Sequence, residues 1–179
     1  MRGDALSIAQ AGKEAGNSVV SIIGARKEAL LLWEERMRTC SDQLIVCTNY
    51  GSYCHQTLVT ETLKDCSNPK KGLSRALDIG PVIIMKFVAE TTRLTRLQTL
   101  VGLNTTRFDG TGMWGGCRVL LDDGAQFVCG EGPEFDAYRV GWANLLERLS
   151  FYQAEEPMAV EIWQRNICNH DLAFEEARR

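Results

Sequence analysis

Two cysteines near a glycine-rich stretch are the residues of this sequence best suited to chemistry. The stretch reads DGTGMWGGCRV over residues 109–119; it contains Cys117, and Cys129 follows it. Thiolates around a glycine-rich loop are typical of iron-sulfur sites, because backbone N–H groups can reach the sulfurs. Two small core residues would give the same pattern, so the spacing leaves a metal site and simple burial both open.

The segment that joins these cysteines predicts a β-hairpin. In CRVLLDDGAQFVC, two short apolar runs flank Asp123 and Gly124, a dipeptide suited to the positive φ of a tight turn. Antiparallel strands would return Cys117 and Cys129 to the same end of the ribbon, beside the glycine-rich stretch. The hairpin is therefore expected to position any chemistry that the two thiols perform.

The elements before the hairpin alternate between helical and strand patterns. Helices are expected at residues 5–17, 27–40, 57–66 and 81–94, and strands at 18–26, 43–48, 75–80 and 97–104. The strand at 18–26 is a nearly continuous β-branched run, which indicates burial on both faces. The helix at 27–40 is expected to bury an apolar face made of Leu30, Leu31, Trp33 and Met37.

This alternation implies an α/β fold with a parallel, doubly wound sheet and right-handed crossovers. Ligands bind such sheets at the carboxyl ends of the strands. The stretches GAR, TNYGSY, IGP and LNTTRFDGTG follow the four predicted strands, as a nucleotide crevice requires. The ordinary polarity of surface loops would give the same pattern, so a nucleotide site stays one of two interpretations.

Composition predicts a cytoplasmic chain. Its seven cysteines cannot all pair, and thiols are normally reduced inside cells. The formal net charge is −3 and there is no basic block, which argues against nucleic acid or an anionic membrane as a partner. No apolar run suits a signal peptide or a spanning helix. A zinc site at Cys54 and His55 is not expected, because this segment has no C-x-x-C pair and no second histidine at a suitable spacing.

Several stretches carry a resemblance to a known family. They are KEAGNSVVSIIGAR, IGPVIIMK, LNTTRFDGTGM, GGCRV and FVCGEGPEFDAYRV. Through them, residues 5–153 resemble the C-terminal part of the alpha subunit of NADH-dependent ferredoxin:NADP oxidoreductase, also called the sulfide dehydrogenase beta subunit, a relative of the dihydroorotate dehydrogenase electron-transfer subunit. That family has an FAD-binding barrel, an NAD(P)-binding α/β domain of ferredoxin reductase type and a 2Fe-2S loop.

The resemblance implies a set of cluster ligands. The family motif is Asp-Gly-Thr-Gly-Met-Cys-Gly-x-Cys, with a further cysteine after the hairpin, and its cluster uses the aspartate and three cysteines. The corresponding metal positions here are Asp109, Cys117 and Cys129, while the fourth falls on Trp114. An indole does not ligate iron, so a cluster needs water or another thiol there.

The resemblance also implies NAD(P)-binding positions at three strand ends. They are Gly24, Arg26, Gly51, Ser52, Gly80 and Pro81. Arg26 is equally consistent with an exposed arginine at a strand end, and Pro81 with a proline that starts a helix. Tyr50 stands where the family has an aspartate, so the family pattern is incomplete beside Gly51.

The predicted organisation has three parts. Residues 1–104 form a partial NAD(P)-binding α/β domain, residues 105–140 an iron-sulfur-type loop and hairpin, and residues 141–179 a C-terminal helical tail. The match begins inside the family's first helix, so we expect the FAD barrel, the first strand and the glycine-rich phosphate turn to be absent. In the tail, Ile162, Trp163 and Ile167 form a partial apolar stripe, expected to pack on the chain's own domain.

The leading functional hypothesis is an electron-transfer oxidoreductase subunit or fragment. It would pass electrons between NAD(P)H, flavin and a second oxidoreductase subunit, with no side chain acting as acid, base or nucleophile. The alternative is a non-catalytic, partner-binding subunit that has lost its redox centres, which Trp114 favours. A dihydroorotate dehydrogenase electron-transfer subunit is a third hypothesis, although that family spaces its cluster cysteines differently.

Overall fold

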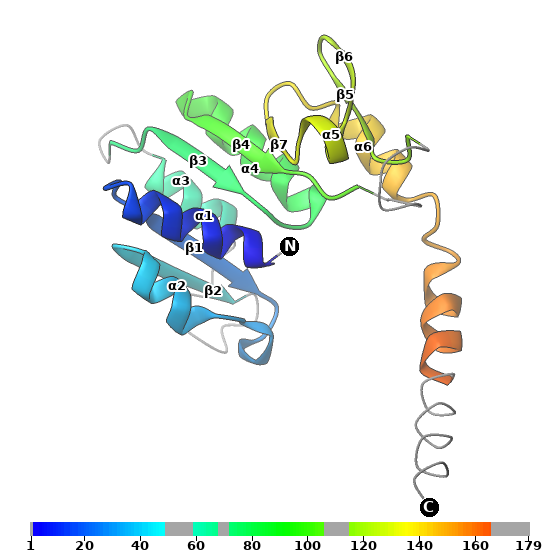
Figure 1. The fold of residues 1–179 in the computed structure, drawn as a ribbon, viewed down its shortest axis with the longest axis horizontal. Coiled ribbons are helices and arrows are strands. Elements are labelled where there is room, and N and C mark those ends of the chain that lie inside the picture. Colours follow the sequence, from blue (N-terminus) through cyan, green and yellow to red (C-terminus); the bar gives the residue numbers. More distant parts are fainter. Residues whose placement is uncertain (1, 49–58, 68–71, 106–114, 166–179) are drawn as a thin grey trace, which may run out of the picture. The chain divides into compact units, whose positions relative to one another are not determined.

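A computed structural model describes residues 2–48, 59–67, 72–105 and 115–165 of the chain (Figure 1). The chain divides into two compact units, Met1–Gly141 and Trp142–Arg179. The first unit contains all the named strands and is mixed α/β. Over the described ranges, no helix combines the length and the apolar character needed to cross a bilayer.

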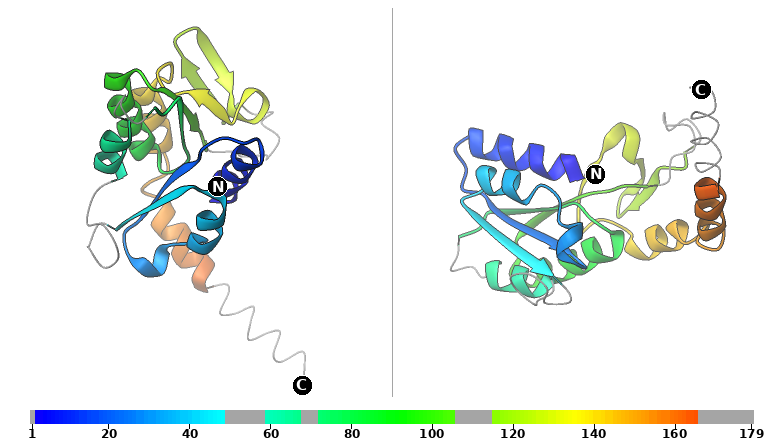
Figure 2. Two further views of the ribbon diagram at one scale, coloured as in Figure 1. Left: turned by 90° about the vertical axis from the view of Figure 1, so that its left-hand side faces the viewer. Right: turned by 90° about the horizontal axis from the view of Figure 1, so that it is seen from below.

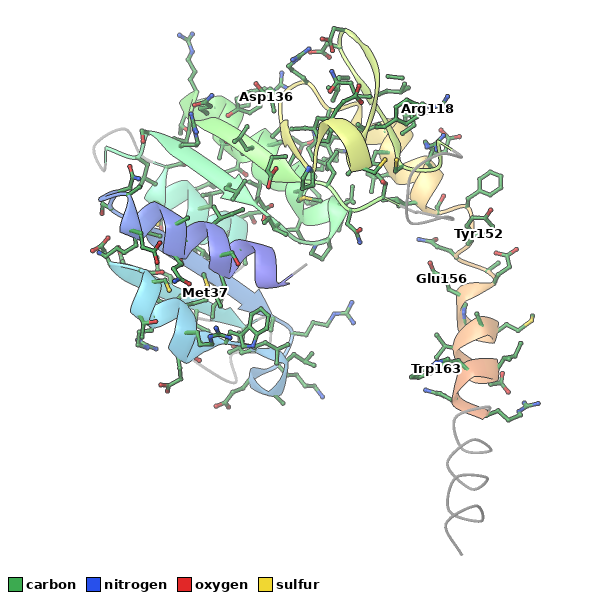
Figure 3. All side chains as sticks on the ribbon, in the orientation of Figure 1. Met37, Arg118, Asp136, Tyr152, Glu156 and Trp163 are labelled. Atoms are coloured by element: carbon green, nitrogen blue, oxygen red, sulfur yellow. The ribbon has the colours of Figure 1, made fainter. Side chains whose placement is uncertain are left out.

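The first parallel pair lies in the N-terminal third of the chain. Its elements are α1 (Arg2–Glu14), β1 (Val20–Ala25), η1 (Glu28–Leu30), α2 (Glu34–Cys40) and β2 (Gln43–Thr48). β1 and β2 run parallel, in register from Val20 opposite Gln43 to Ala25 opposite Thr48. Leu6 and Ala9 of α1 pack with Met37 of α2, which Figure 3 labels, and this apolar contact holds the two helices together.

The predicted end of the first helix is confirmed. Gly16 has a φ of +81°, and its N–H donates to the Lys13 carbonyl at 2.9 Å. The N–H of Asn17 donates to the Gly12 carbonyl at 3.1 Å. Glycine takes this left-handed conformation without the steric cost that a side chain brings, so the chain can reverse here into β1.

The second sheet follows β2 in the sequence. Its elements are α3 (Val59–Cys66), β3 (Arg75–Asp78), α4 (Val82–Thr95), β4 (Gln98–Gly102) and the later strand β7 (Glu134–Asp136). The strand order is β3-β4-β7, with β3 and β4 parallel and β7 antiparallel to β4. α3 packs against both β1 and α4 and so connects the two sheets. Pro81 caps α4, as the sequence predicts.

The remaining elements are a hairpin and C-terminal helices. They are β5 (Arg118–Leu121), β6 (Gly124–Phe127), α5 (Val128–Glu131) and α6 (Trp142–Leu149), followed by helical residues 156–165. The predicted hairpin is confirmed, but its turn lies one residue earlier, on Asp122 and Asp123. Gly124 begins β6 and carries the positive φ, of 135°. The Arg139 guanidinium forms an ion pair with the Asp123 carboxylate beside this turn.

The predicted helix at 27–40 is wrong. The chain forms a short 3-10 turn, η1, then runs extended through Leu31 before α2 begins at Glu34. Trp33 precedes α2 with a φ of +60°, and the Arg36 guanidinium lies over its ring. Leu30 and Trp33 are exposed, so Met37 is the buried member of the predicted apolar face. Glu34 and Glu35 in the first turn, and the ion pair from Arg38 to Glu34, favour the later helix start.

The sheet differs from expectation in one respect. The α/β fold and the parallel pairing of neighbouring strands are confirmed, but the described strands form two separate parallel pairs instead of one continuous sheet (Figure 2). β1, expected to be buried on both faces, has Ser21 as its one buried residue. A strand paired along one side has less cover than a central strand, which accounts for this exposure.

The helical tail belongs to the second unit. Residues 156–165 are helical, as predicted, and the side chains of Ile162 and Trp163 are 51% and 63% exposed. Trp163 is labelled in Figure 3, where it extends away from the helix axis. No described residue of this unit covers the stripe, and Ile167 lies outside the described residues.

Candidate functional site

The two thiols meet at the open end of the hairpin. The sulfurs of Cys117 and Cys129 are 3.0 Å apart and are not joined by a disulfide. Cys117 is fully buried, whereas Cys129 is exposed. The pair therefore has one sulfur fixed inside the fold and one at its surface.

Backbone hydrogen bonds hold the two cysteines together. Arg118 of β5 lies opposite Phe127 of β6, and the Val128 N–H donates to the Cys117 carbonyl at 3.1 Å. This bond extends the ladder one step past the named strands. The N–H of Phe127 donates to the Glu131 carboxylate, which ties down α5 and the cysteine it carries. The antiparallel register thus places the thiols where the sequence predicts them.

A tight turn leads into Cys117. Gly115 has a φ of +66°, a conformation that favours glycine, and its carbonyl accepts the Arg118 N–H at 3.3 Å. A Cβ at residue 115 would lie 3.3 Å from the Phe127 ring. The presence of glycine at position 115 is therefore explained both by its backbone conformation and by its packing against the Phe127 ring.

The thiol pair offers two neighbouring sulfurs to a metal ion. Two thiolates bound to one tetrahedral metal ion at about 2.3 Å each lie about 3.8 Å apart. The sulfurs of Cys117 and Cys129, at 3.0 Å, are closer than this and would move slightly apart to bind one ion. Among the residues that the structure describes, no group of three or more His, Cys, Asp or Glu side chains forms a metal site. Asp109 and Trp114 lie outside the described residues. Of the three predicted metal positions, the described residues thus contain Cys117 and Cys129 and bring their sulfurs together.

The predicted nucleotide positions of the first strand end lie after β1. Gly24 is the next-to-last residue of β1, and Arg26 follows the strand with its side chain exposed. A Cβ at Gly24 would come within 2.5 Å of the Val59 side chain at the start of α3. Close packing of α3 is therefore a structural reason for this glycine, independent of any ligand. Gly51 and Ser52 lie outside the described residues.

The strand end at Gly80 and Pro81 is more open. The nearest atom to a Cβ at Gly80 would be the Asp78 Oδ1, at 3.9 Å. The Pro81 carbonyl accepts the N–H groups of Ile84 and Met85 in the first turn of α4. Pro81 therefore starts the helix, while Gly80 leaves room next to the Asp78 carboxylate.

Sequence reasoning missed two side chains at this edge of the second sheet. Asp78 ends β3, and burial raises the pKa of its carboxyl from 3.8 to about 6, with the Ile79 N–H acting in the opposite direction. Thr105 follows β4 and is 6% exposed. The Asp78 Oδ2 and the Thr105 hydroxyl are buried without a hydrogen-bond partner in the described structure. A lone acid and a lone threonine follow no motif, so only the fold reveals them.

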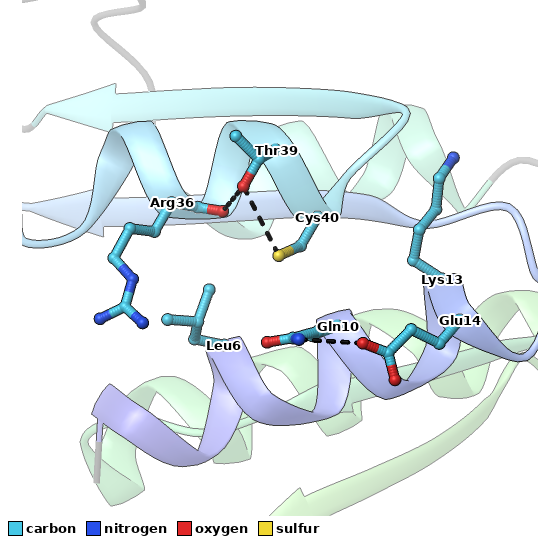
Figure 4. Close-up of a pocket in the computed structure, with 7 residues that line it drawn as sticks. All are labelled: Leu6, Gln10, Lys13, Glu14, Arg36, Thr39 and Cys40. Carbon is cyan, nitrogen blue, oxygen red and sulfur yellow. Dashed lines mark hydrogen bonds between the residues drawn. The ribbon is translucent and has the colours of Figure 1, made fainter.

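A hollow of about 370 Å³ lies between α1 and α2 (Figure 4). Its lining includes Leu6, Arg36 and Cys40. Lys13, also in the lining, pairs with Asp42, and this hydrogen bond lowers the pKa of the Asp42 carboxyl. The hollow adjoins the residues that precede β1 and β2, away from the carboxyl ends of these strands. It is therefore not the nucleotide crevice that the parallel strands predict.

Comparison with known proteins first shows which type of domain the hairpin region resembles. Residues 106–141 match the sequence profile of the iron-sulfur cluster binding domain of dihydroorotate dehydrogenase B. This range contains both thiols, and the class agrees with their convergence at one end of the hairpin.

Similar proteins then extend the match to most of the chain. The dihydroorotate dehydrogenase B (NAD(+)) electron transfer subunit homolog of Thermotoga maritima is 36% identical over 154 residues, which cover 86% of this chain and 54% of the relative. An uncharacterized protein from the adh 3′ region of Clostridium beijerinckii is also 36% identical, over 159 residues, covering 88% of this chain and 54% of that protein.

A solved structure gives the same result. A chain from the structure of NADH-dependent reduced ferredoxin-NADP oxidoreductase, described with regard to flavin-based electron bifurcation, is 34% identical with a TM-score of 0.78. The match covers 88% of this chain and 56% of that chain. Over most of its length, the protein is therefore similar to electron-transfer subunits of the ferredoxin-NADP oxidoreductase and dihydroorotate dehydrogenase B type, which confirms the resemblance. It spans about half the length of these relatives.

Proposed function

We propose that this chain is an electron-transfer subunit, or part of one, that passes electrons between NAD(P)H, a flavin and a second oxidoreductase subunit. The convergence of Cys117 and Cys129 at the hairpin base carries the proposal, because it lies within the region similar to an iron-sulfur domain. The names of the relatives, an electron transfer subunit homolog and a ferredoxin-NADP oxidoreductase, support the same role.

In this proposal, the thiol pair holds iron together with Asp109. A 2Fe-2S centre supplies one-electron transfer when it is bound. Trp114 stands at the position of the fourth ligand and offers only an N–H donor, so water or another thiol completes the set. The buried sulfur of Cys117 fixes one side of the site, and exposed Cys129 faces the surface, where a redox partner can approach.

We also propose that the two parallel pairs are halves of one doubly wound NAD(P)-binding sheet. A strand between β1 and β3 would complete it, in the place of the family's first strand. β1 pairs only with β2 in the described structure, although its sequence has the apolar pattern of a central strand. Assembly with a partner that supplies this strand should slow amide hydrogen exchange in both β1 and β3. Unchanged exchange in either strand would contradict this arrangement.

A second candidate is a partner-binding subunit without redox centres. Trp114 favours it, because this residue removes one cluster ligand. Within the residues that the structure describes, β1 and β3 each have one edge without a neighbouring strand, which offers such a subunit a way to bind another polypeptide through strand addition.

Iron and acid-labile sulfide content separates the two candidates. The protein is purified anaerobically, reconstituted with iron and sulfide, and followed by visible absorption. Stoichiometric iron and sulfide with a charge-transfer spectrum would support the electron carrier. A folded protein that stays free of iron would favour the partner-binding subunit, and the hairpin would then have a structural role only.

A further inference from the structure

The two hairpin cysteines differ in exposure although their sulfurs are close together. The Cys117 side chain is fully buried and Cys129 is exposed, while their sulfurs lie 3.0 Å apart without a bond between them. Exchange between thiols and disulfides needs one sulfur that a reagent can reach and a second sulfur within reach of the first. The pair meets both requirements without a metal.

The hairpin holds the two sulfurs close to bonding distance. Val128, which precedes Cys129, donates its N–H to the Cys117 carbonyl at 3.1 Å. A disulfide has an S–S length of about 2.05 Å, so the two sulfurs need to approach each other by only about 1 Å. Both cysteines lie just outside the paired strands β5 and β6, so this movement leaves the strand pairing intact.

Exposure determines which sulfur reacts first. Cys117 has no accessible surface, so a dissolved reagent reaches the pair through Cys129. Gly130 follows Cys129, and apart from its chain neighbours and its own helix, no described atom lies within 4 Å of a Cβ built at this glycine. This open space accommodates a group attached to the Cys129 sulfur, while Cys117 stays in place to displace it.

We infer that Cys117 and Cys129 form a dithiol that exchanges with low-molecular-weight disulfides, R–S–S–R, when they hold no metal. The Cys129 sulfur attacks the reagent, which breaks its S–S bond, forms a Cys129–S–S–R bond and releases one R–SH with the proton of the Cys129 thiol. The Cys117 sulfur then attacks the Cys129 sulfur, forms the Cys117–Cys129 bond and releases the second R–SH. In total, the two cysteines lose two electrons and two protons, and the reagent gains them as two thiols.

This reaction goes beyond the proposed electron transfer and does not depend on it, because it takes place in the metal-free chain. The disulfide and the metal-bound state exclude each other, since a cysteine ligates metals as a thiolate and a disulfide removes both thiolates. Trp114, which offers only an N–H donor at the family's fourth ligand position, favours the metal-free state. Oxidation of the pair therefore blocks iron uptake, and reduction restores it.

The test exposes the full chain, freed of metal by a chelator, to oxidised glutathione. Remaining thiols are then blocked with an alkylating reagent, and circular dichroism checks that the oxidised protein is folded. Trypsin cuts between the two cysteines, after Arg118, and places them in peptides 108–118 and 119–139. Mass spectrometry should find these two peptides joined by one disulfide, and dithiothreitol should separate them.

Variants resolve the two steps of the reaction. Cys117→Ser should stop after the first step and retain one glutathione on Cys129, whereas Cys129→Ser should gain none on Cys117, because that sulfur is buried. Cys40→Ser, which changes a partly exposed cysteine on α2, is the matched control and should form the wild-type disulfide. In the reduced wild-type protein, Cys129 should be alkylated at least about tenfold faster than Cys117.

The outcomes are distinct. A folded wild-type chain that forms no Cys117–Cys129 disulfide, or that pairs either cysteine equally well with another one, would overturn the inference; iron uptake by the same chain would leave the proposed electron transfer in place. A reversible Cys117–Cys129 disulfide in a chain that takes up no iron would support the inference and contradict the electron carrier. Where the reduced chain takes up iron, the oxidised chain should take up none until it is reduced, and equal uptake would overturn the mutual exclusion.

Discussion

The hairpin and the carboxyl edge of the second sheet present two kinds of site. In the hairpin, two reactive side chains meet each other, with the sulfurs of Cys117 and Cys129 3.0 Å apart. At the sheet edge, the polar atoms of Asp78 and Thr105 have no partner among the described residues. The hairpin is recognised because two reactive side chains lie together. The sheet edge is recognised because two buried polar atoms lack hydrogen-bond partners in the described part of the chain.

The largest expected effect is at the thiol pair. Cys117→Ala or Cys129→Ala should abolish iron binding in the reconstituted protein, because each removes one of the two thiolates that the hairpin brings together. Cys47→Ala is the matched control: this cysteine is also buried but lies on β2, where its sulfur contacts the Thr62 hydroxyl. Iron analysis by mass spectrometry checks the prediction. Equal iron loss in all three variants would contradict the ligand assignment.

A gain of iron is expected from the opposite change. Trp114→Cys places a thiol at the family's fourth ligand position, and should raise the iron and sulfide content above that of the wild-type protein. Visible absorption during reconstitution measures the gain. If occupancy does not rise, the loop has departed from the family's site by more than this one residue.

Asp78 should make stability depend on pH. Because its pKa is raised from 3.8 to about 6 in the fold, its protonated form is favoured there. The free energy of unfolding should therefore fall as pH rises from about 4 to about 6, by up to about 3 kcal/mol. Asp78→Asn should remove this loss and be more stable than wild type at pH 7. Urea denaturation without ligand at several pH values tests this, and parallel pH profiles for both proteins would contradict it.

Two glycines predicted to bind cofactor should respond differently. Gly24→Ala should lower the free energy of unfolding by about 1–3 kcal/mol, because its Cβ would lie 2.5 Å from the Val59 side chain. Gly80→Ala should change it by less than about 0.5 kcal/mol, since the nearest atom is 3.9 Å away. Thermal unfolding measures both. The double variant Gly24→Ala, Val59→Ala should recover part of the loss, and no recovery would point to another cause.

Local patterns predicted much of the fold. The strand at 43–48 has the expected bounds, and Pro81 starts α4 as proline commonly does. Apolar periodicity and glycine turns depend on a few neighbouring residues, so they can be recognised in the sequence itself. The hairpin belongs to this group, and its antiparallel geometry was enough to place the two cysteines together.

Three features of the structure were not predictable from the sequence. The helix at 27–40 breaks at Trp33, where the backbone is left-handed, although the apolar spacing continues across it. β7 pairs with β4 from a distant segment. Asp78 and Thr105 lack any motif, because their significance comes from burial beside a neighbouring strand. Packing between distant segments decides the last two features, and a single sequence gives little information on it. The break at Trp33 has local causes, but the continuing apolar spacing conceals it.

The most direct test of the central claim is reduced-state electron paramagnetic resonance of the anaerobically reconstituted full chain, quantified against its iron content. The account predicts the signal of a reduced 2Fe-2S centre that is absent from Cys117→Ala prepared in the same way. A folded wild-type protein that gives no such signal and holds no iron would contradict the claim that this hairpin is an electron carrier.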